Sequence, residues 1–522
     1  MSEPIPDAFL CPITQEVMKV PVMAADGHSY DRHAIQTWFS QGKTTSPLTN
    51  EDLGCLELYP NHALRSRIHD FVTAQKQAKR ELLLAELAVV QENQRHGYED
   101  PLFQASLVSV DDAILDTLSV LAAVLVGWKN DLDVAKETLH AMGRVLDHNT
   151  TTNPLIVSRS THLRLFPVIM DTLREFESDG PLQEAGISAL GDVIRHRSFT
   201  GGHVDVTQAS DIILTTLRRF PSDTAIHLAA LECLHEIARY SPSCINKTGI
   251  CRTLNQTLRA FDDDRHIQEL CILIAGKVCG TNIANKLCTS GVCKRIVDCM
   301  LRVEFKHDAK ILYAGCFALS RIYHGRNSCD ETACHVVVHA LSCAISSNEQ
   351  VQGELMEAAC RAVARLILID RHQKILIELD IISSLTNILA YSTTSTEHVD
   401  ISKAAIHALE MITVAEDKNV TDPDQLFPHL LKILVVREYD RDLYLSILNL
   451  LYSISVQPNN GAALVLHQLD FHRPIVHIMK TNAGDEDIQI VGWGLLSCIH
   501  DASCQKELGD IVLDGMDMDM DI

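Results

Sequence analysis

The chain has 522 residues, of which 46% are hydrophobic and 22% are charged, enough for several packed domains or one long repeat array. Its net charge of −23 argues against nucleic-acid binding, because such a protein must neutralise phosphates. The 17 cysteines include no Cys-x-x-Cys pair, the first residues are unlike a signal peptide, and no run of about 18 apolar residues could span a membrane.

Residues 5–75 are predicted to form a small mixed α/β domain. The segment is dense in proline, glycine and turn residues, and its apolar residues alternate near positions 17–22 as they do in short strands. Asp31 is a candidate N-cap for one helix, and Asn61 is a candidate N-cap for a second helix. We expect the second helix to continue to about Arg95.

A series of short motifs follows in order through this segment. The motifs read Phe-x-Cys-Pro-Ile, Glu-x-Met, Pro-Val, Gly-x-Ser-Tyr-x-Arg, Ile-x-x-Trp, Pro-x-Thr and Pro-Asn-x-x-Leu, and their residues are Phe9, Cys11, Pro12, Ile13, Glu16, Met18, Pro21, Val22, Gly27, Ser29, Tyr30, Arg32, Ile35, Trp38, Pro47, Thr49, Pro60, Asn61 and Leu64. The series resembles the U-box family closely. The resemblance implies a RING-like domain without zinc that recruits a ubiquitin-conjugating enzyme.

The resemblance also implies which residues bind the conjugating enzyme. Ile13 in the first loop, Trp38 on the central helix and Pro47 in the second loop match the family's shallow apolar groove. An exposed cluster of this kind suits a small binding hot spot. For Trp38 the alternative is a core residue, and Ile35 is assigned to the core. Asn50 matches a polar position, often Arg in the family, that stimulates transfer, or else it is simply a turn residue or helix cap.

No metal or cofactor is predicted for the chain, this domain included. A zinc site needs Cys or His ligands in closely spaced pairs, but the segment offers only Cys11 and Cys55 with scattered histidines. Hydrogen bonds and ion pairs are expected to replace the metal. The residues assigned to this structural role are Cys11, Glu16, Asp26, Tyr30, Asp31 and Arg32. Two departures from the family are Val20, where Asp is usual, and Ser46, where Cys is frequent.

Residues 76–101 are predicted to be a helical connector, and residues 102–507 a repeat array. An apolar motif after a small residue recurs at Met142, Leu190, Leu234, Ala275, Leu319, Val363, Leu409, Leu451 and Leu496, at intervals of 41–48 residues. This period is that of HEAT and armadillo arrays, in which stacked helical units form a solenoid. The connector packs on the first repeat in our preferred interpretation, and forms a dimerising coiled coil in the alternative.

Segments such as 267–300 and 362–389 resemble the armadillo pattern, with Asp380 where Gly is usual. The array has only Trp128 and Trp493, so the tryptophan ladder of importin-type armadillo proteins is absent. The net negative charge leaves binding of basic peptides by the array as an open alternative. Residues 508–522 are predicted to be an acidic disordered tail. The expected fold class is therefore mostly α, with a small zinc-free RING-like α/β domain before an armadillo-like α-solenoid.

The resemblance to the U-box family, together with the repeat array, implies a ubiquitin-protein ligase without a covalent enzyme intermediate. Its expected partners are a ubiquitin-conjugating enzyme, ubiquitin and a protein substrate bound by the repeats. Cys233, Cys271, Cys316 and Cys360 lie on apolar helix faces and are expected to be core thiols. The thiols indicate a reducing compartment, cytoplasmic and alternatively also nuclear. The alternative function is a non-enzymatic armadillo scaffold whose U-box is inactive or serves only for docking.

Overall fold

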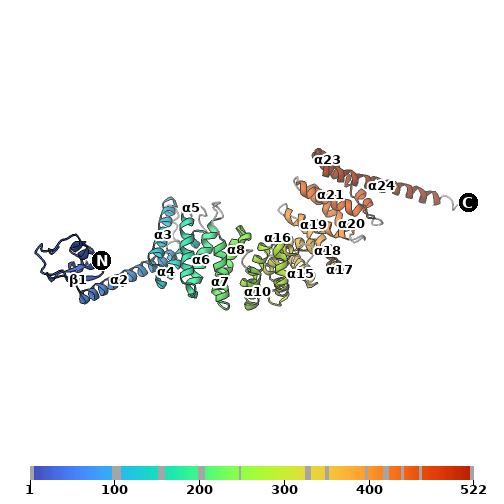
Figure 1. Ribbon diagram of the computed structural model, residues 1–522. Coiled ribbons are helices and arrows are strands. Elements are labelled where there is room, and N and C mark those ends of the chain that lie inside the picture. Colours follow the sequence, from blue (N-terminus) through green and yellow to red (C-terminus); the bar gives the residue numbers. More distant parts are fainter. Residues whose placement is uncertain are drawn as a thin grey trace. The chain divides into compact units, whose positions relative to one another are not determined.

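A computed structural model describes residues 5–96, 107–150, 159–197, 206–245, 249–323, 331–346, 352–393, 398–415, 422–436, 440–457 and 461–517. The chain divides into two compact units, up to Phe176 and from Glu177 onward. Each unit is built mainly of helices that follow one another in chain order (Figure 1).

The N-terminal domain is a three-stranded antiparallel sheet with one helix of its own. The sheet has the order β2-β1-β3, and Val22 pairs with both Tyr30 and Pro60. The elements are a 3₁₀ turn η1 (Asp7–Phe9), β1 (Pro21–Met23), β2 (Ser29–Asp31), α1 (Arg32–Ser40) and β3 (Tyr59–Pro60). The core contains Phe9, Cys11, Met18, Val22, Ala24, Tyr30, Ile35 and Ile68. Ile35 is fully buried, as predicted.

Both predicted N-caps of this domain are present. The Asp31 carboxylate accepts a hydrogen bond from the His33 N–H at the start of α1. The Asn61 side chain accepts one from the Leu64 N–H at the start of α2 (His62–His96). These bonds satisfy amide groups that a helix start leaves without partners. The long second helix is therefore confirmed.

The remaining helices of the first unit are α3 (Leu107–Gly127), α4 (Leu132–Thr150) and α5 (Arg159–Glu175), and α2 packs against α4. Arg80 on α2 bonds Asp131 at 2.7 Å and also pairs with Asp133. This contact agrees with a connector that packs on the first repeat. The end of the predicted connector, at Pro101, lies outside the described part of the chain.

The second unit contains two rows of stacked helices. Neighbours in the first row are α6 (Gly180–Arg197), α8 (Thr224–Tyr240), α11 (Arg265–Val278), α14 (Ala309–Ile322), α16 (Gln352–Leu366), α19 (Val399–Ala415), α21 (Arg441–Ser455) and α24 (Glu486–Asp517). The second row is α7 (Thr207–Arg219), α10 (Ile250–Ala260), α13 (Val292–Leu301), α15 (Thr332–Ser346), α18 (Ile381–Ser392), α20 (Pro423–Val436) and α23 (His472–Thr481). Short helices α9 (Pro242–Ile245), α12 (Thr281–Thr289), α17 (Asp370–Glu378) and α22 (Ala462–Gln468) lie between them in sequence.

The predicted repeat positions fall on one type of helix. Met142 lies on α4, and every later anchor lies on a first-row helix. All the anchors are buried except Leu496, which is half-buried beside the buried Leu495. Each unit hides an apolar face only by stacking on its neighbours, which is the property that defines a solenoid.

An aspartate begins most of these long helices and accepts the N–H three residues later. The caps are Asp131, Asp179, Asp223, Asp264, Asp308, Asp440 and Asp485. Each stands eleven residues before an anchor, as in 308 and 319. The cap therefore repeats with the same period as the apolar core.

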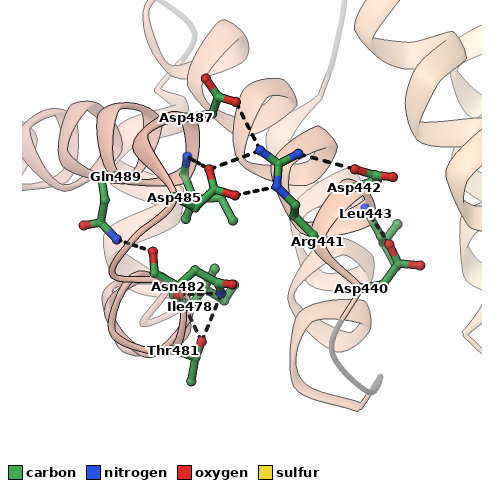
Figure 2. Close-up of polar contacts among 11 residues, drawn as sticks. Asp440, Arg441, Asp442, Leu443, Ile478, Thr481, Asn482, Asp485, Asp487 and Gln489 are labelled. Carbon is green, nitrogen blue, oxygen red and sulfur yellow. Dashed lines mark hydrogen bonds and ion pairs between the residues drawn. The ribbon is translucent and has the colours of Figure 1, made fainter.

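Several of these caps also bind a basic residue of the preceding repeat. Arg265 bonds the two Asp308 oxygens at 2.5 and 3.2 Å, and Lys403 lies 2.6 Å from Asp440. Figure 2 shows the equivalent junction near the C-terminal end, where Arg441 pairs with Asp485 and Asp487. The same carboxylates thus cap a helix and join it to the preceding repeat.

Three of the second-row helices begin directly after a residue in the left-handed conformation. Gly249, Gly291 and Asp380 have φ values of 79°, 84° and 54° directly before α10, α13 and α18. Asp380 therefore takes the place of a glycine, as its sequence position indicates, and Asp is among the few residues that tolerate this conformation.

Two further sequence predictions concern the ends and the apolar segments. α24 continues to Asp517, into the segment predicted to be a disordered tail, and the domain boundaries at 75, 101 and 507 stay predictions. No single described helix is both long and apolar enough to cross a membrane, although the bent pair of α17 and α18 meets that test by length and composition.

Candidate functional site

A buried hydrogen-bond cluster holds the second loop of the N-terminal domain. The Tyr30 hydroxyl donates to Asp26 Oδ2 at 2.7 Å and lies 3.2 Å from Ser46 Oγ. Ser46 Oγ also accepts the N–H groups of Leu48 and Thr49. Burial raises the pKa of Tyr30 to about 12, so its hydroxyl keeps its proton and remains a donor.

A second cluster centres on Asp31. One carboxylate oxygen accepts the N–H groups of Lys19 and Val20, and the other accepts that of His33. Burial alone would raise the pKa of Asp31, but these N–H donors outweigh it and lower the value. The Asp31 N–H in turn donates to the buried Cys11 Sγ at 3.2 Å. Cys11 is therefore a small buried thiol, as predicted.

The two loops of the domain have the same internal geometry. They read Cys-Pro-Ile-Thr-Gln-Glu from Cys11 and Ser-Pro-Leu-Thr-Asn-Glu from Ser46. In each loop the first N–H donates to the sixth carbonyl at 2.8 Å, and the fifth N–H donates to the first carbonyl. The fifth residues, Gln15 and Asn50, have left-handed φ values of 57° and 64°. Cys11 and Ser46 thus occupy equivalent positions at the base of matched loops.

The predicted groove residues lie on these loops and on α1. Ile13 and Trp38 are half-buried and pack against the same core cluster, and Pro47 is half-buried beside the exposed Leu48. The Trp38 indole N–H donates to the Thr45 carbonyl at 2.8 Å, and the Lys43 ammonium lies 3.7 Å from its ring centroid. Trp38 therefore ties α1 to the second loop and also presents part of its surface to solvent.

Not all of the residues predicted to replace the metal do so through their side chains. Glu16 contributes through its backbone, where its carbonyl accepts the Cys11 N–H, and its side chain is exposed. The Arg32 N–H donates to the Val20 carbonyl, while its buried Nε has no hydrogen-bond partner. Within the described residues Arg32 forms no ion pair. Of the expected hydrogen bonds and ion pairs, the described residues named here form hydrogen bonds, centred on the carboxylates of Asp26 and Asp31 and the hydroxyls of Tyr30 and Ser46.

The sequence interpretation missed Ser46 as a structural centre. It treated Ser46 only as a departure from the family, although its hydroxyl is buried and bonded to Tyr30. The repeated pattern of Cys-Pro-x-Thr and Ser-Pro-x-Thr would have revealed the equivalence of Cys11 and Ser46. Asn50 is exposed and its φ fits a turn residue, which leaves its side chain facing solvent.

A groove of about 620 Å³ crosses three first-row helices of the repeats. Its lining residues are Tyr313, Phe317, Ser320 and Arg321 of α14, Glu354, Glu357, Ala358, Arg361, Ala364 and Arg365 of α16, and His407 of α19. Tyr313 and Phe317 stack with centroids 6.2 Å apart. Phe317 needs Gly276 on α11, because a Cβ there would lie 2.8 Å from its ring.

The charges of this groove differ from the acidic average of the chain. It gathers three arginines against two glutamates. Arg361 pairs with Glu357 at 2.6 Å, and Arg321 lies over the Phe317 ring at 5.5 Å. Within the described residues neither Arg321 nor Arg365 pairs with a carboxylate. These two guanidinium groups are available to an acidic ligand beside an aromatic surface.

The four cysteines assigned to the repeat core are fully buried. Burial raises the pKa of Cys233, Cys271, Cys316 and Cys360 well above the ordinary range. A thiol of this kind stays protonated and is a poor nucleophile. The prediction that these residues are core thiols is confirmed.

Two family models match the chain. The U-box domain model matches residues 5–77, and the LRRK2 ARM repeat model matches residues 99–399. The first match covers the sheet, both loops and the start of α2. The second extends from the end of the connector into the helix pairs that form the Arg-containing groove.

Known proteins resemble the two parts separately. WD repeat, SAM and U-box domain-containing protein 1 of Danio rerio is 53% identical over 70 residues, which are 13% of this chain and 14% of that protein. U-box domain-containing protein 57 of Arabidopsis thaliana is 54% identical over 65 residues, which are 12% and 17% of the two chains. The matches thus span less than a fifth of either relative.

The repeats resemble a solved armadillo-type structure in fold. A chain from a study of a phosphorylation switch that controls the interaction between cadherin and beta-catenin gives a TM-score of 0.58 at 12% identity. The match covers 79% of this chain and 82% of that one. The predicted fold class, a small α/β domain followed by an armadillo-like solenoid, is confirmed.

The Tyr30 cluster predicts a local stability effect. Tyr30→Phe removes the hydroxyl that serves Asp26 and Ser46, and should cost about 1–3 kcal/mol because buried acceptors lose their donor. Hydrogen exchange of the full chain should show about tenfold or greater loss of protection in the two loops. Tyr59→Phe removes an exposed hydroxyl bonded to Glu57 and should leave the loops unchanged. Equal effects of the two substitutions would contradict the cluster's role.

Proposed function

We propose that this chain, which belongs to the LRRK2 ARM repeat family and carries a U-box at its N-terminus, is a ubiquitin ligase. U-box proteins are generally ubiquitin ligases, and repeats of this type suggest protein binding. The observation that carries the proposal is the U-box match over residues 5–77. Within this segment, hydrogen bonds to Cys11 and Ser46 hold the two loops that share the same internal geometry.

The proposed groove for the conjugating enzyme is formed by Ile13, Trp38 and Pro47. A shallow apolar surface on rigid loops suits a partner loop, because little side-chain entropy is lost on binding. Leu48 is 52% exposed and occupies the second loop at the position equivalent to Ile13. We assign it to the edge of the same surface.

In the proposed reaction the chain supplies position rather than a nucleophile. A substrate lysine attacks the thioester between the conjugating enzyme and ubiquitin, and the enzyme's thiol leaves. Holding both partners together accounts for the acceleration. The burial of Cys233, Cys271, Cys316 and Cys360 argues against these four thiols as carriers of ubiquitin and fits a mechanism without a covalent intermediate on this chain. The abundance of free thiols also supports a reducing, cytoplasmic or nuclear location.

The Arg-containing groove is the proposed substrate site. Arg321 and Arg365, which pair with no carboxylate among the described residues, flank an aromatic surface, so the ligand expected there is an extended acidic segment with an apolar side chain. An acidic ligand is the opposite of the basic peptide that the net negative charge of the chain allowed as an alternative. The competing function, a scaffold with a docking-only U-box, would use the same groove but would not transfer ubiquitin.

The ligase proposal predicts a specific loss of activity. With a panel of conjugating enzymes, the wild-type chain should build ubiquitin chains on itself, and Ile13→Ala or Pro47→Ala should slow this by more than about tenfold, as expected for hot-spot truncation. Ile5→Ala removes a similar side chain that is 44% exposed outside the groove, and should retain activity. A folded wild-type chain that is inactive with every enzyme would establish the scaffold instead.

The role of Asn50 can be separated from its backbone conformation. Glycine tolerates the φ of 64° at this position, so Asn50→Gly removes the side chain without strain. If the amide stimulates transfer, discharge of ubiquitin from the conjugating enzyme to free lysine should slow by about tenfold or more, with unchanged binding of the enzyme. Gln15→Gly, at the equivalent position of the first loop, is the control. Unchanged discharge would identify Asn50 as a turn residue only.

The substrate groove predicts a charge preference. Fluorescent peptides rich in Asp and Glu with one aromatic residue should bind the full chain, whereas matched Lys-rich peptides should not. The double variant Arg321→Ala and Arg365→Ala should weaken acidic-peptide binding by about tenfold or more. Arg295→Ala on α13, outside the groove, is the matched control. Preferential binding of the Lys-rich peptides would refute the assignment, as would affinity that is insensitive to the double variant.

A further inference from the structure

We propose that His307, His339 and Cys343 form a Zn²⁺ site that joins two neighbouring repeats. His339 and Cys343 are one turn apart on α15. His307 lies in the segment between α13 and α14. The three candidate ligand atoms all lie within 4.8 Å of one another. The site is separate from the U-box, and it departs from the sequence-based expectation of no metal.

The distances match those of a tetrahedral zinc site. Cys343 Sγ lies 3.6 Å from His307 Nδ1 and 3.4 Å from His339 Nε2. Zinc bonds of about 2.3 Å to sulfur and 2.0 Å to nitrogen, at tetrahedral angles, place such ligand atoms about 3.6 Å apart. Both sulfur–nitrogen distances are therefore close to those of a zinc site, and all three candidate ligand atoms lie within 4.8 Å of one another.

A backbone oxygen stands beside the same point. The Lys306 carbonyl lies 2.9 Å from His339 Nε2 and 4.0 Å from Cys343 Sγ. In the absence of an ion, His339 can donate to this carbonyl. When an ion takes the nitrogen, the carbonyl is released from that bond and can face the ion, or a water completes the four ligands.

The donor set selects the type of metal. Two imidazoles and one thiolate suit Zn²⁺, whereas Mg²⁺ and Ca²⁺ prefer oxygen ligands. Before an ion binds, the Cys343 side chain is a thiol. Its proton passes to solvent when the ion enters, and the S–H bond is replaced by an S–Zn bond. His307 is exposed, which leaves a path for the ion.

The ion would fix a junction close to the substrate groove. His307 directly precedes Asp308, which caps α14 and binds Arg265 of the preceding repeat. α14 carries Tyr313 and Phe317 of the groove. A metal link from this segment to α15 would hold the start of α14 from both sides. Binding to the folded state alone would also stabilise the array.

The test measures metal binding by the full chain after treatment with a chelator. Zn²⁺ is titrated against a chromophoric chelator, and Co²⁺ serves as a spectroscopic probe of tetrahedral geometry and thiolate bonding. We expect one equivalent in the wild type. His307→Ala and Cys343→Ser should weaken binding by more than about 100-fold, because losing a ligand costs more than losing an outer-shell partner. Cys343→Ser should also abolish the thiolate–Co²⁺ band.

Two controls keep the proposal falsifiable. His335→Ala removes an exposed histidine of α15 one turn from His339 and should bind Zn²⁺ as the wild type does. Cys288→Ser tests a different part of the repeats, where the thiols of Cys288 and Cys293 lie 3.0 Å apart. The proposal is overturned by the absence of a stoichiometric site, by binding that survives both ligand substitutions, or by loss of binding in Cys288→Ser. Circular dichroism checks that each variant is folded.

Discussion

An aspartate at the start of most of the long helices is the constraint on which the repeat array depends. A helix start leaves four N–H groups without partners, and stacking would bury some of them. Asp264 and Asp308 each satisfy one such group on their own helices. Because Asp308 also binds Arg265 at the start of the preceding first-row helix, the two helix starts are held level. The start of α14, the helix that carries Tyr313 and Phe317 of the groove, is therefore fixed relative to α11.

The N-terminal domain uses the same chemistry on a smaller scale. Cys11 and Ser46 occupy equivalent positions in the two loops, and the side chain of each accepts a hydrogen bond from a backbone N–H. The carboxylates of Asp26 and Asp31 accept the other hydrogen bonds that hold the loops. Burial would favour their neutral forms, but the surrounding N–H and O–H donors lower the pKa of both. Charged acceptors with several donors can thus fix loops that lack a metal.

Patterns that recur along the chain could be predicted from the sequence, whereas contacts between distant segments could not. The period of the anchors predicts the helices, and the armadillo pattern identifies Asp380 as standing where Gly is usual, because both depend on local spacing. The left-handed φ of Asp380 is what the structure adds. By contrast, His307 and Cys343 are 36 residues apart, and the groove combines side chains of three helices. Arg32 illustrates the same limit. The U-box motif identifies the residue, but not the Val20 carbonyl to which its backbone N–H donates.

In the proposed ligase function, rigid loops rather than a reactive group are what this chain contributes to ubiquitin transfer. Cys233, Cys271, Cys316 and Cys360 are buried thiols, and in the proposed reaction the thioester chemistry belongs to the conjugating enzyme. The rate of that reaction would depend on how well the chain holds its partners, because effective concentration falls steeply when geometry loosens. The Trp38 bond to the Thr45 carbonyl and the Tyr30 contact with Ser46 fix the loop that presents Pro47 and Asn50. The residues that matter most for catalysis in such a domain therefore include those that never touch ubiquitin.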